Sequence, residues 1–450
     1  MSAHWLAPLS LVLALGSGVR GLAAQTSADT LHLSLGDAAR LAAERAAPVL
    51  EADARIDAAE ARVAARTGAL LPSLDADVVR GARTFNTASF GLEFPAPPGE
   101  PPLFDPAGEV VGPVASADVR AHLDVPLLDL AALAQRRSAR SGADAARADR
   151  EAVSEAAAGA AALAYVRALR AQAEVTARER DLALAEELTA VAEGQVEAGV
   201  AVAIDVTRAE AQVATMRARL LAARQRARVA ELALQRSLHL PEDVRVVLTD
   251  GMERPPEPVP TEPEALRRAR AERADLTRTE ARRTAAQQGV DAERAARLPR
   301  VSAALDEGFF GRGFGSLLNT YTWSVRLSVP VFDGLQRRAR LREGEAQVRE
   351  LEVRAADLED EVRFQVRAAL LELEASSEQV AAAEERLRLA ELEVEQEEER
   401  VRAGVAGTAD VVRAALRLGE ARTALLDVLQ AQQAARIALA AATGTVTELP

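Results

Sequence analysis

The stretch Val196-Glu197-Ala198-Gly199-Val200-Ala201 recurs in the second half of the chain as Val401-Arg402-Ala403-Gly404-Val405-Ala406. The similarity continues without a gap through Asp205-Val206 in the first half and Asp410-Val411 in the second. A match that keeps its spacing over this length is the sign of an internal repeat. The 450 residues therefore contain two copies of one structural unit.

Each copy contains two segments in which apolar and polar residues alternate, near 72–80 and 116–126 in the first copy and near 299–309 and 318–330 in the second. Alternation with a period of two predicts strands with one apolar and one polar face. Each segment has about the ~10 residues that a tilted membrane strand needs. Taken singly each strand fits a half-buried soluble sheet, but together the four favour a barrel with lipid outside and water inside.

Aromatic residues near one end of the second strand pair support the membrane interpretation. Phe309, Phe310, Tyr321 and Trp323 lie where the interfacial girdle of a membrane barrel is expected. Four strands cannot close a barrel around water, and an open edge in lipid leaves backbone groups unpaired. We therefore expect an oligomer, and three copies would supply twelve strands. Aspartates on the polar strand faces predict a lumen with a mild preference for cations.

Prolines separate the strands from their neighbouring helices, at Pro72, Pro126, Pro299 and Pro330. Proline lacks an amide hydrogen and biases the preceding residue toward extended backbone, so it ends one hydrogen-bonded ladder and starts another. Four prolines at equivalent places indicate junctions of the repeat. Ordinary turn prolines would account for only one or two of them.

Two very long helices follow the strand pairs, because no strong helix breaker occurs between Pro126 and Gly199 or between Pro330 and Gly404. Some 65 to 70 helical residues reach on the order of 100 Å. The two glycines suit the left-handed turn that ends a helix. Thr408 is expected to cap the returning helix. The abundant alanine favours helices that pack closely side by side.

Glutamates are concentrated before the second turn. This acidic stretch is either a solvated helix face or the acidic wall of a conduit. It contains Glu391, Glu393, Glu395, Glu397, Glu398 and Glu399.

Composition argues against several functions. A net charge of −13 argues against nucleic acid, which requires clustered positive charge. The chain has no cysteine, its four histidines are scattered, and it has neither a phosphate loop nor a nucleophile motif. We expect neither an enzyme, nor a cofactor, nor a metal site. An apolar run from Leu6 to Leu15 followed by Ala23 and Ala24 predicts a signal peptide over 1–24, and no other apolar stretch predicts a transmembrane helix.

These features together resemble the TolC family of outer-membrane efflux proteins, over essentially the whole mature chain. The stretches 197–206 and 402–412 are similar to the two tip motifs of the family, a glycine followed six residues later by Asp-Val. The resemblance implies a mainly α-helical protein with a transmembrane β part, a TolC-like α/β barrel. Residues 25–240 and 264–450 would be the two repeats, joined by a linker over 241–263.

The resemblance also implies an assembly. The implied assembly is a homotrimer in outer-membrane lipid, with its helical tube in the periplasm. The implied partners are a periplasmic adaptor, or membrane fusion protein, and an inner-membrane pump of the RND, ABC or MFS type. The adaptor opens an entrance formed by the tips, with contacts expected at Gly199, Val200, Gly404 and Val405.

At the entrance, Asp205, Asp410 and Arg413 are the candidates for a gate that lines the lumen. Both aspartates also suit the positive start of a helix, and Asp410 can pair with Arg413 one turn away. The expected function is passive conduction in a tripartite efflux system. Type I protein secretion and metal efflux use the same kind of conduit. A soluble periplasmic coiled-coil scaffold is the alternative of another class.

Overall fold

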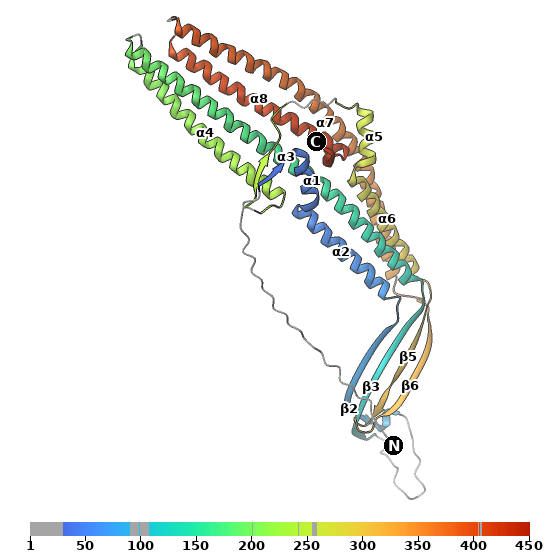
Figure 1. The fold of residues 1–450 in the computed structure, drawn as a ribbon. Helices are drawn as coiled ribbons and strands as arrows, with labels where there is room; N and C mark the ends of the chain where they lie inside the picture. The colour runs from blue at the N-terminus through green and yellow to red at the C-terminus, as the bar shows by residue number, and fades with distance from the viewer. Residues whose placement is uncertain are drawn as a thin grey trace, which may run out of the picture.

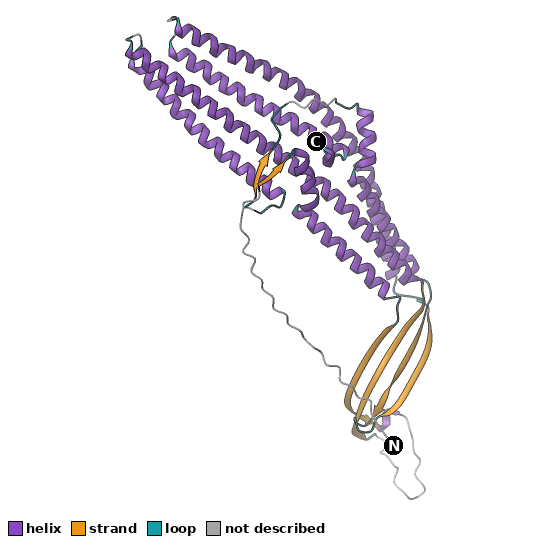
Figure 2. Ribbon diagram, in the orientation of Figure 1, coloured by secondary structure: helices purple, strands orange, loops and turns teal. Residues whose placement is uncertain are grey.

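A computed structural model describes residues 30–90, 99, 108–199, 201–241, 243–253, 259–403, 405 and 407–450. The expected signal peptide, 1–24, lies outside the described residues. The molecule is elongated, with long helices at one end and a narrow β-sheet at the other (Figures 1 and 2). The shorter helices lie between these two ends.

The order of elements repeats, as the sequence predicts. Each copy consists of two short helices, two strands, one long helix and one returning helix. The first copy contains α1 (Leu35–Arg45), α2 (Ala47–Gly68), β2 (Ser73–Asn86), β3 (Val110–Asp129), α3 (Leu130–Glu197) and α4 (Ala203–Ser237). The second contains α5 (Glu262–Glu272), α6 (Ala274–Ala295), β5 (Arg300–Gly311), β6 (Leu318–Ser328), α7 (Gln336–Arg402) and α8 (Thr408–Thr443). Short 3-10 helices follow β2, at Thr87–Phe90, and α8, at Val446–Glu448.

The long helices have the predicted length, since α3 contains 68 residues and α7 contains 67. Each would extend about 100 Å at ~1.5 Å per residue. Their buried positions are mostly alanine and valine, which lets neighbouring helices pack closely. The largest buried cluster lies at mid-length, where α1, α3, α4 and α8 meet around Tyr165. The Tyr165 hydroxyl donates a 3.0 Å hydrogen bond to the carbonyl of Leu33.

The four predicted strands form one antiparallel sheet in the order β2-β3-β5-β6. Leu74, Leu123, Leu305 and Trp323 form one row across it. The next row is Asp75, His122, Asp306 and Thr322, which by alternation face the other side. The apolar and polar faces are therefore those that the sequence predicts. In the single chain β2 and β6 are the two edges of this sheet.

β2 and β3 are longer than predicted, and their pairing extends to Asn86 and Val110. Alternation is lost in this outer part, at Gly81 and Gly112, and the register shifts between Arg83 and Phe85. The backbone ladder continues because it does not require alternating side chains. The sequence pattern therefore reveals only the regular part of these strands.

A second, two-stranded sheet is absent from the sequence prediction. β1 (Thr30–Leu33) pairs in parallel with β4 (Arg245–Leu248). Only β4 lies within the predicted linker. Strands of four residues are too short to give a clear period. The helix expected before each strand pair is also divided, at Ala46 in the first copy and Arg273 in the second. Pro48 follows the first break and suits the first turn of α2.

One helix in the described ranges, α3, contains a window of 18 residues with a mean hydropathy of 1.2, so it is long and apolar enough to cross a membrane by length and composition alone. The expectation that no helix meets this criterion is therefore wrong. Alanine is the reason, because it raises the mean hydropathy without adding bulk. One third of that window is buried in the protein, and α3 packs against α1, α2, α4, α6 and α8.

Candidate functional site

Four helices form an array that reaches the tip of the molecule, and they follow one another across the view in the order α4, α3, α8, α7 (Figure 1). α3 and α4 form one antiparallel pair, and α7 and α8 form the other. The seam between the pairs is mainly the contact of α3 with α8, with a smaller contact of α4 with α8. α4 and α7 are therefore the two outer edges of the array.

The first tip turn has the predicted form. Gly199 follows the end of α3 with φ of 73°, a left-handed conformation that glycine adopts without strain. At the second turn Val405 is 68% exposed. Val200 and Gly404, the other predicted contact residues, lie outside the described residues.

The cap of α8 differs from the prediction. The helix begins at Thr408 itself, and Gly407 is the N-cap with φ of −92° and ψ of 157°. As a glycine, Gly407 makes no side-chain capping hydrogen bond. The prediction that Thr408 caps the helix is therefore wrong, because the preceding glycine takes the extended conformation of the cap position.

The predicted gate residues lie in the first turns of the returning helices, and each aspartate pairs within its own helix. Asp205 accepts a 3.4 Å hydrogen bond from Arg208, and Asp410 forms an ion pair with Arg413. Carboxylates in a first turn also face the positive end of the helix. The structure therefore shows a local role for both aspartates, and their place in the lumen stays a prediction.

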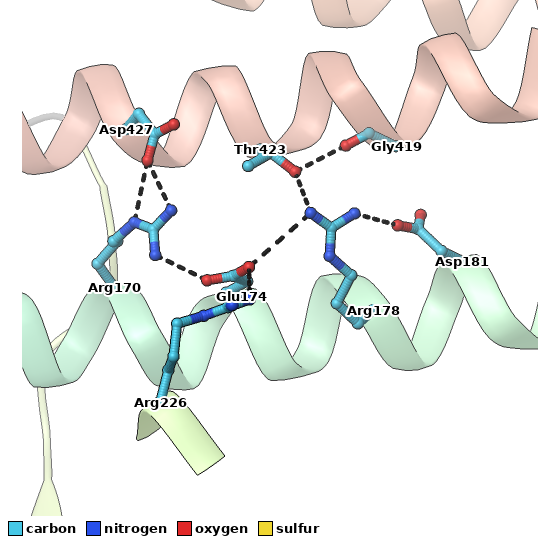
Figure 3. Close-up of polar contacts among 8 residues, drawn as sticks. All are labelled: Arg170, Glu174, Arg178, Asp181, Arg226, Gly419, Thr423 and Asp427. Carbon is cyan, nitrogen blue, oxygen red and sulfur yellow. Dashed lines mark hydrogen bonds and ion pairs between the residues drawn. The ribbon is translucent and has the colours of Figure 1, made fainter. Parts of the chain in front are cut away.

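A network of charges around two buried carboxylates lies farther from the tip, between α3, α4 and α8 (Figure 3). Glu174 on α3 is only 3% exposed. It accepts 2.7 Å hydrogen bonds from Arg170, on the same helix, and from Arg226 on α4. Arg170 also donates to Asp427 on α8, at 3.0 Å from Nε and 2.6 Å from Nη2. This part of the network connects three helices.

Asp181 is the second buried carboxylate, at 8% exposed. It accepts hydrogen bonds from Arg178 of its own helix at 3.1 Å and from Arg422 on α8 at 3.0 Å. Arg178 also donates at 2.7 Å to Thr423, whose hydroxyl donates to the carbonyl of Gly419 (Figure 3). The seam of α3 and α8 is thus crossed by ion pairs at two levels, and between them Arg178 donates a hydrogen bond to the neutral hydroxyl of Thr423.

The electrostatics of the network favour its charged state. Burial lowers the pKa of Arg170, but the hydrogen bonds and charges of Asp427 and Glu174 raise it more, so this pKa lies above its usual value. The Nε atom of Arg178 is buried and has no hydrogen-bond partner in the described structure. These bonds connect α3 and α8 at defined positions along both helices.

Sequence reasoning missed this network, although a signal was present. Arg170, Glu174, Arg178 and Asp181 recur at steps of three and four residues, the spacing of a buried helix face. Charged residues at such spacing are usually solvated. Here they alternate in sign, and α8 supplies charges of the opposite sign at the same levels.

The strand residues form a smaller cluster on the polar face of the sheet. His122 Nδ1 lies 2.5 Å from Asp306 Oδ1, and His122 Nε2 lies 3.4 Å from Asp77 Oδ2. Within the described ranges, no group of three or more histidine, cysteine, aspartate or glutamate side chains could hold a metal ion. The arrangement places one histidine between two aspartates on the polar face of the sheet.

The predicted girdle residues divide between the two faces. Phe309, Tyr321 and Trp323 follow the apolar face, whereas Phe310 pairs with Asp118 and belongs to the other face. All four are exposed in the single chain. Their contact with lipid stays a prediction.

Comparison with known proteins gives one family for both copies. The family model described as "Outer membrane efflux protein" matches residues 38–238 and 265–445. The outer membrane efflux protein BepC of Brucella suis biovar 1 (strain 1330) is 27% identical over 274 residues, which cover 60% of this chain and 59% of BepC. The chain thus aligns with about three fifths of that relative.

Solved structures show the same fold. A membrane protein from Pseudomonas aeruginosa aligns with a TM-score of 0.74 and 20% identity, over 91% of this chain and 93% of that one. The Campylobacter jejuni CmeC outer membrane channel gives a TM-score of 0.73 with 16% identity, over 91% and 85%. The open state of the Neisseria gonorrhoeae MtrE outer membrane channel gives 0.72 with 20% identity, over 91% and 88%.

Proposed function

Because this chain belongs to the outer membrane efflux protein family, we propose that it is the outer-membrane channel of a tripartite efflux system. Its substrates cross a water-filled tunnel from the periplasm to the exterior without covalent chemistry. The observation that carries this proposal is a sheet with an apolar exposed face, joined to an array of long helices.

The exposed apolar side chains of the sheet are explained by lipid. Leu74 is 71% exposed, Trp323 70% and Leu327 65%. A protein surrounded by water rarely exposes an apolar patch of this extent. In a membrane barrel this face contacts lipid, while the opposite face, with its aspartates and His122, lines the lumen. We expect a mild preference for cations, which reversal potentials in a salt gradient measure.

Trimerisation follows from the free edges of the sheet. β2 and β6 each offer an unpaired row of backbone groups, which is costly in lipid. Pairing of β6 with β2 of the next copy closes twelve strands into a barrel of ordinary size. The helices of three copies would form the periplasmic tube in the same way.

The entrance of the channel is at the two tip turns, and we expect it to be closed at rest. A periplasmic adaptor, itself bound to an inner-membrane pump of the RND, ABC or MFS type, would contact the exposed tips and open it. Asp205 and Asp410 lie beside this entrance, where each is already paired with an arginine. Drug efflux, type I protein secretion and metal efflux would all use this conduit.

Single-particle electron microscopy of the mature protein in detergent tests the proposal. A three-fold cylinder with a barrel at one end and a tapered tube on the order of 100 Å long supports it. A compact monomer that salt alone releases from the cell envelope would favour the periplasmic scaffold instead.

A further inference from the structure

The ends of four helices next to the four-stranded sheet are basic. α2 and α6 end, and α3 and α7 begin, where the helices meet the strands (Figure 1). Together the segments 62–72, 130–140, 294–300 and 336–342 contain twelve arginines and no aspartate or glutamate. The whole chain has a net charge of −13, so average composition does not explain this concentration of arginine. We call these four segments the basic rim.

The two long helices change sign along their length. In α7 the segment 372–402, toward the tip, has eleven glutamates and four arginines, and in α3 the segment 172–197 has seven acidic residues and two arginines. Neither helix has an acidic residue in its first turn, at the rim. Acidic residues are the ones favoured there, because the first turn is the positive end of the helix dipole. Helix stability therefore gives no reason for the arginines at the starts of α3 and α7.

Five arginines at the starts of these two helices are exposed, and none forms an ion pair with a described residue. They are Arg136 and Arg137 on α3 and Arg338, Arg340 and Arg342 on α7. The carboxylate before each helix is already bonded, since Asp129 accepts a hydrogen bond from the backbone of α3 and Asp333 pairs with Arg337. The described chain therefore leaves most of this positive charge without a counter-charge.

The five arginines lie close to the apolar part of the molecule. They fall within the first eight residues of α3 or the first seven of α7. That is within about 11 Å of the helix start, at ~1.5 Å per residue. The connection from β6 to α7 exposes apolar side chains just before them, with Val331 91% exposed and Phe332 79% exposed. Apolar residues followed directly by unpaired arginines are typical of a chain that passes from hydrocarbon into the layer of headgroups.

We propose that the basic rim binds anionic phospholipids of the membrane leaflet that faces the helices, through their phosphate groups. The proposal rests on the proposed function, because only a sheet inserted in a membrane brings the rim to these headgroups. A guanidinium group binds phosphate oxygens with two parallel hydrogen bonds. The field of an anionic leaflet falls off within a Debye length of about 8–10 Å, so it acts on the rim and not on the distant tip. The bound lipids hold the sheet at a fixed depth in the membrane.

Vesicles of two compositions test the proposal, one of phosphatidylcholine alone and one of phosphatidylcholine and phosphatidylglycerol in equal parts. The rim variant carries Arg338→Gln, Arg340→Gln and Arg342→Gln, and a second version carries lysine at the same three positions. The matched control removes three exposed arginines of α4 and α5 that form no ion pair with a described residue. Its substitutions are Arg219→Gln, Arg236→Gln and Arg270→Gln. Glutamine and lysine are good helix formers, so the helices should be retained in all three variants.

Each protein is extracted from the mixed vesicles in mild detergent, and the lipids that stay bound are measured by mass spectrometry. The unaltered protein should retain phosphatidylglycerol over phosphatidylcholine by about fivefold or more, the factor that one arginine contributes near an anionic surface. The lysine version and the matched control should keep this enrichment, whereas the glutamine rim variant should lose most of it. The melting temperature of the unaltered protein should also be higher in the mixed vesicles than in phosphatidylcholine, and this shift should vanish in the glutamine rim variant.

Other outcomes overturn the inference. Equal enrichment in the unaltered protein and the glutamine rim variant would show that the rim does not select the lipid. An equal loss in the matched control would show that only the total charge of the protein matters. If inorganic phosphate, in detergent at matched ionic strength, raises the melting temperature as much as phosphatidylglycerol does, the rim binds a soluble anion and not a lipid. Failure of the proposed function is distinct, because the unaltered protein would then form neither trimers nor channels, while its bound lipids are still measured.

Discussion

The carboxylate of Asp181 on α3 occupies the space beside Gly419 on α8, where an added Cβ atom would lie 3.0 Å from Oδ2. Glycine at this position lets a buried carboxylate reach Arg422 across the seam. The close approach of the two helices and their ion pair therefore depend on each other.

Gly419→Ala tests this relationship, with Gly194→Ala on α3 as its matched control. Alanine in a helix interior is favoured over glycine by roughly 0.5–1 kcal/mol. Gly194 has open space around it, so this gain should appear as a higher melting temperature of the detergent-solubilised protein. At Gly419 the displaced carboxylate should reverse the gain. Equal stabilisation by both substitutions would show that Asp181 moves freely.

Asp181→Asn should be strongly destabilising, because it leaves Arg178 and Arg422 facing a neutral amide in a buried site. Breaking one side of a buried pair costs about 3–5 kcal/mol. Glu186→Gln removes the partner of Arg217 from an exposed pair and should cost less than about 1 kcal/mol. Urea unfolding of both variants measures the difference. Similar losses of unfolding free energy in the two variants would mean that water reaches the network around Asp181.

Gly444→Ala should destabilise the region where α8 ends. Gly444 has φ of 76°, and a Cβ atom there would lie 2.8 Å from the backbone carbon of Glu272. The left-handed conformation alone costs a non-glycine residue about 1–3 kcal/mol. Gly68→Ala, at the end of α2 with open space around it, is the control and should be neutral or stabilising. Thermal unfolding of the two variants measures the difference, and equal melting temperatures would contradict the prediction.

The charge of Asp275 should make the folded protein less stable in acid. Burial raises the pKa of this carboxyl group, but the hydrogen bonds from Arg273 and the charges of Arg273 and Arg278 lower it more, so its folded pKa lies below 3.8. The unfolded chain therefore binds the proton more readily, and the stabilisation, present above the unfolded pKa, is lost as pH falls through the folded pKa.

The measurement compares Asp275→Asn with the unaltered protein across pH. Asparagine should lower the melting temperature at neutral pH, because Arg273 is 8% exposed and loses its charged partner. The difference should begin to shrink as pH falls below the unfolded pKa, near 4, and should disappear only below the folded pKa, where the carboxylate is protonated in the folded protein as well. A difference that stays constant with pH would exclude the charge of Asp275 as its cause.

Val405→Asp should abolish export without disturbing assembly. Val405 is exposed at the tip, so a charge there costs little folding energy but alters the surface that an adaptor would contact. Dye efflux from cells measures export, and gel filtration of the purified variant measures the trimer. Unchanged efflux would show that Val405 is not part of the contact surface.

The sequence predicts the repeat, the four strands and the two long helices because each depends on a local pattern. Alternation identifies the sheet faces, and Gly199 marks the turn that it forms. The buried network is harder to predict, since Asp181 and Arg422 are far apart in the chain and each resembles a surface residue. The short strands β1 and β4 are not predicted for the same reason, because only their pairing with each other identifies them as strands.

The pairing of β1 with β4 sets an order on folding. Thr249 donates its hydroxyl to the carbonyl of Leu33 across 216 positions of the chain, so this contact must wait for all of α3 and α4. Contacts between distant positions form slowly, because a long loop has to close first. The first copy is therefore completed only when the segment that leads to the second copy has been synthesised. The first folding unit therefore extends beyond the first repeat into the linker.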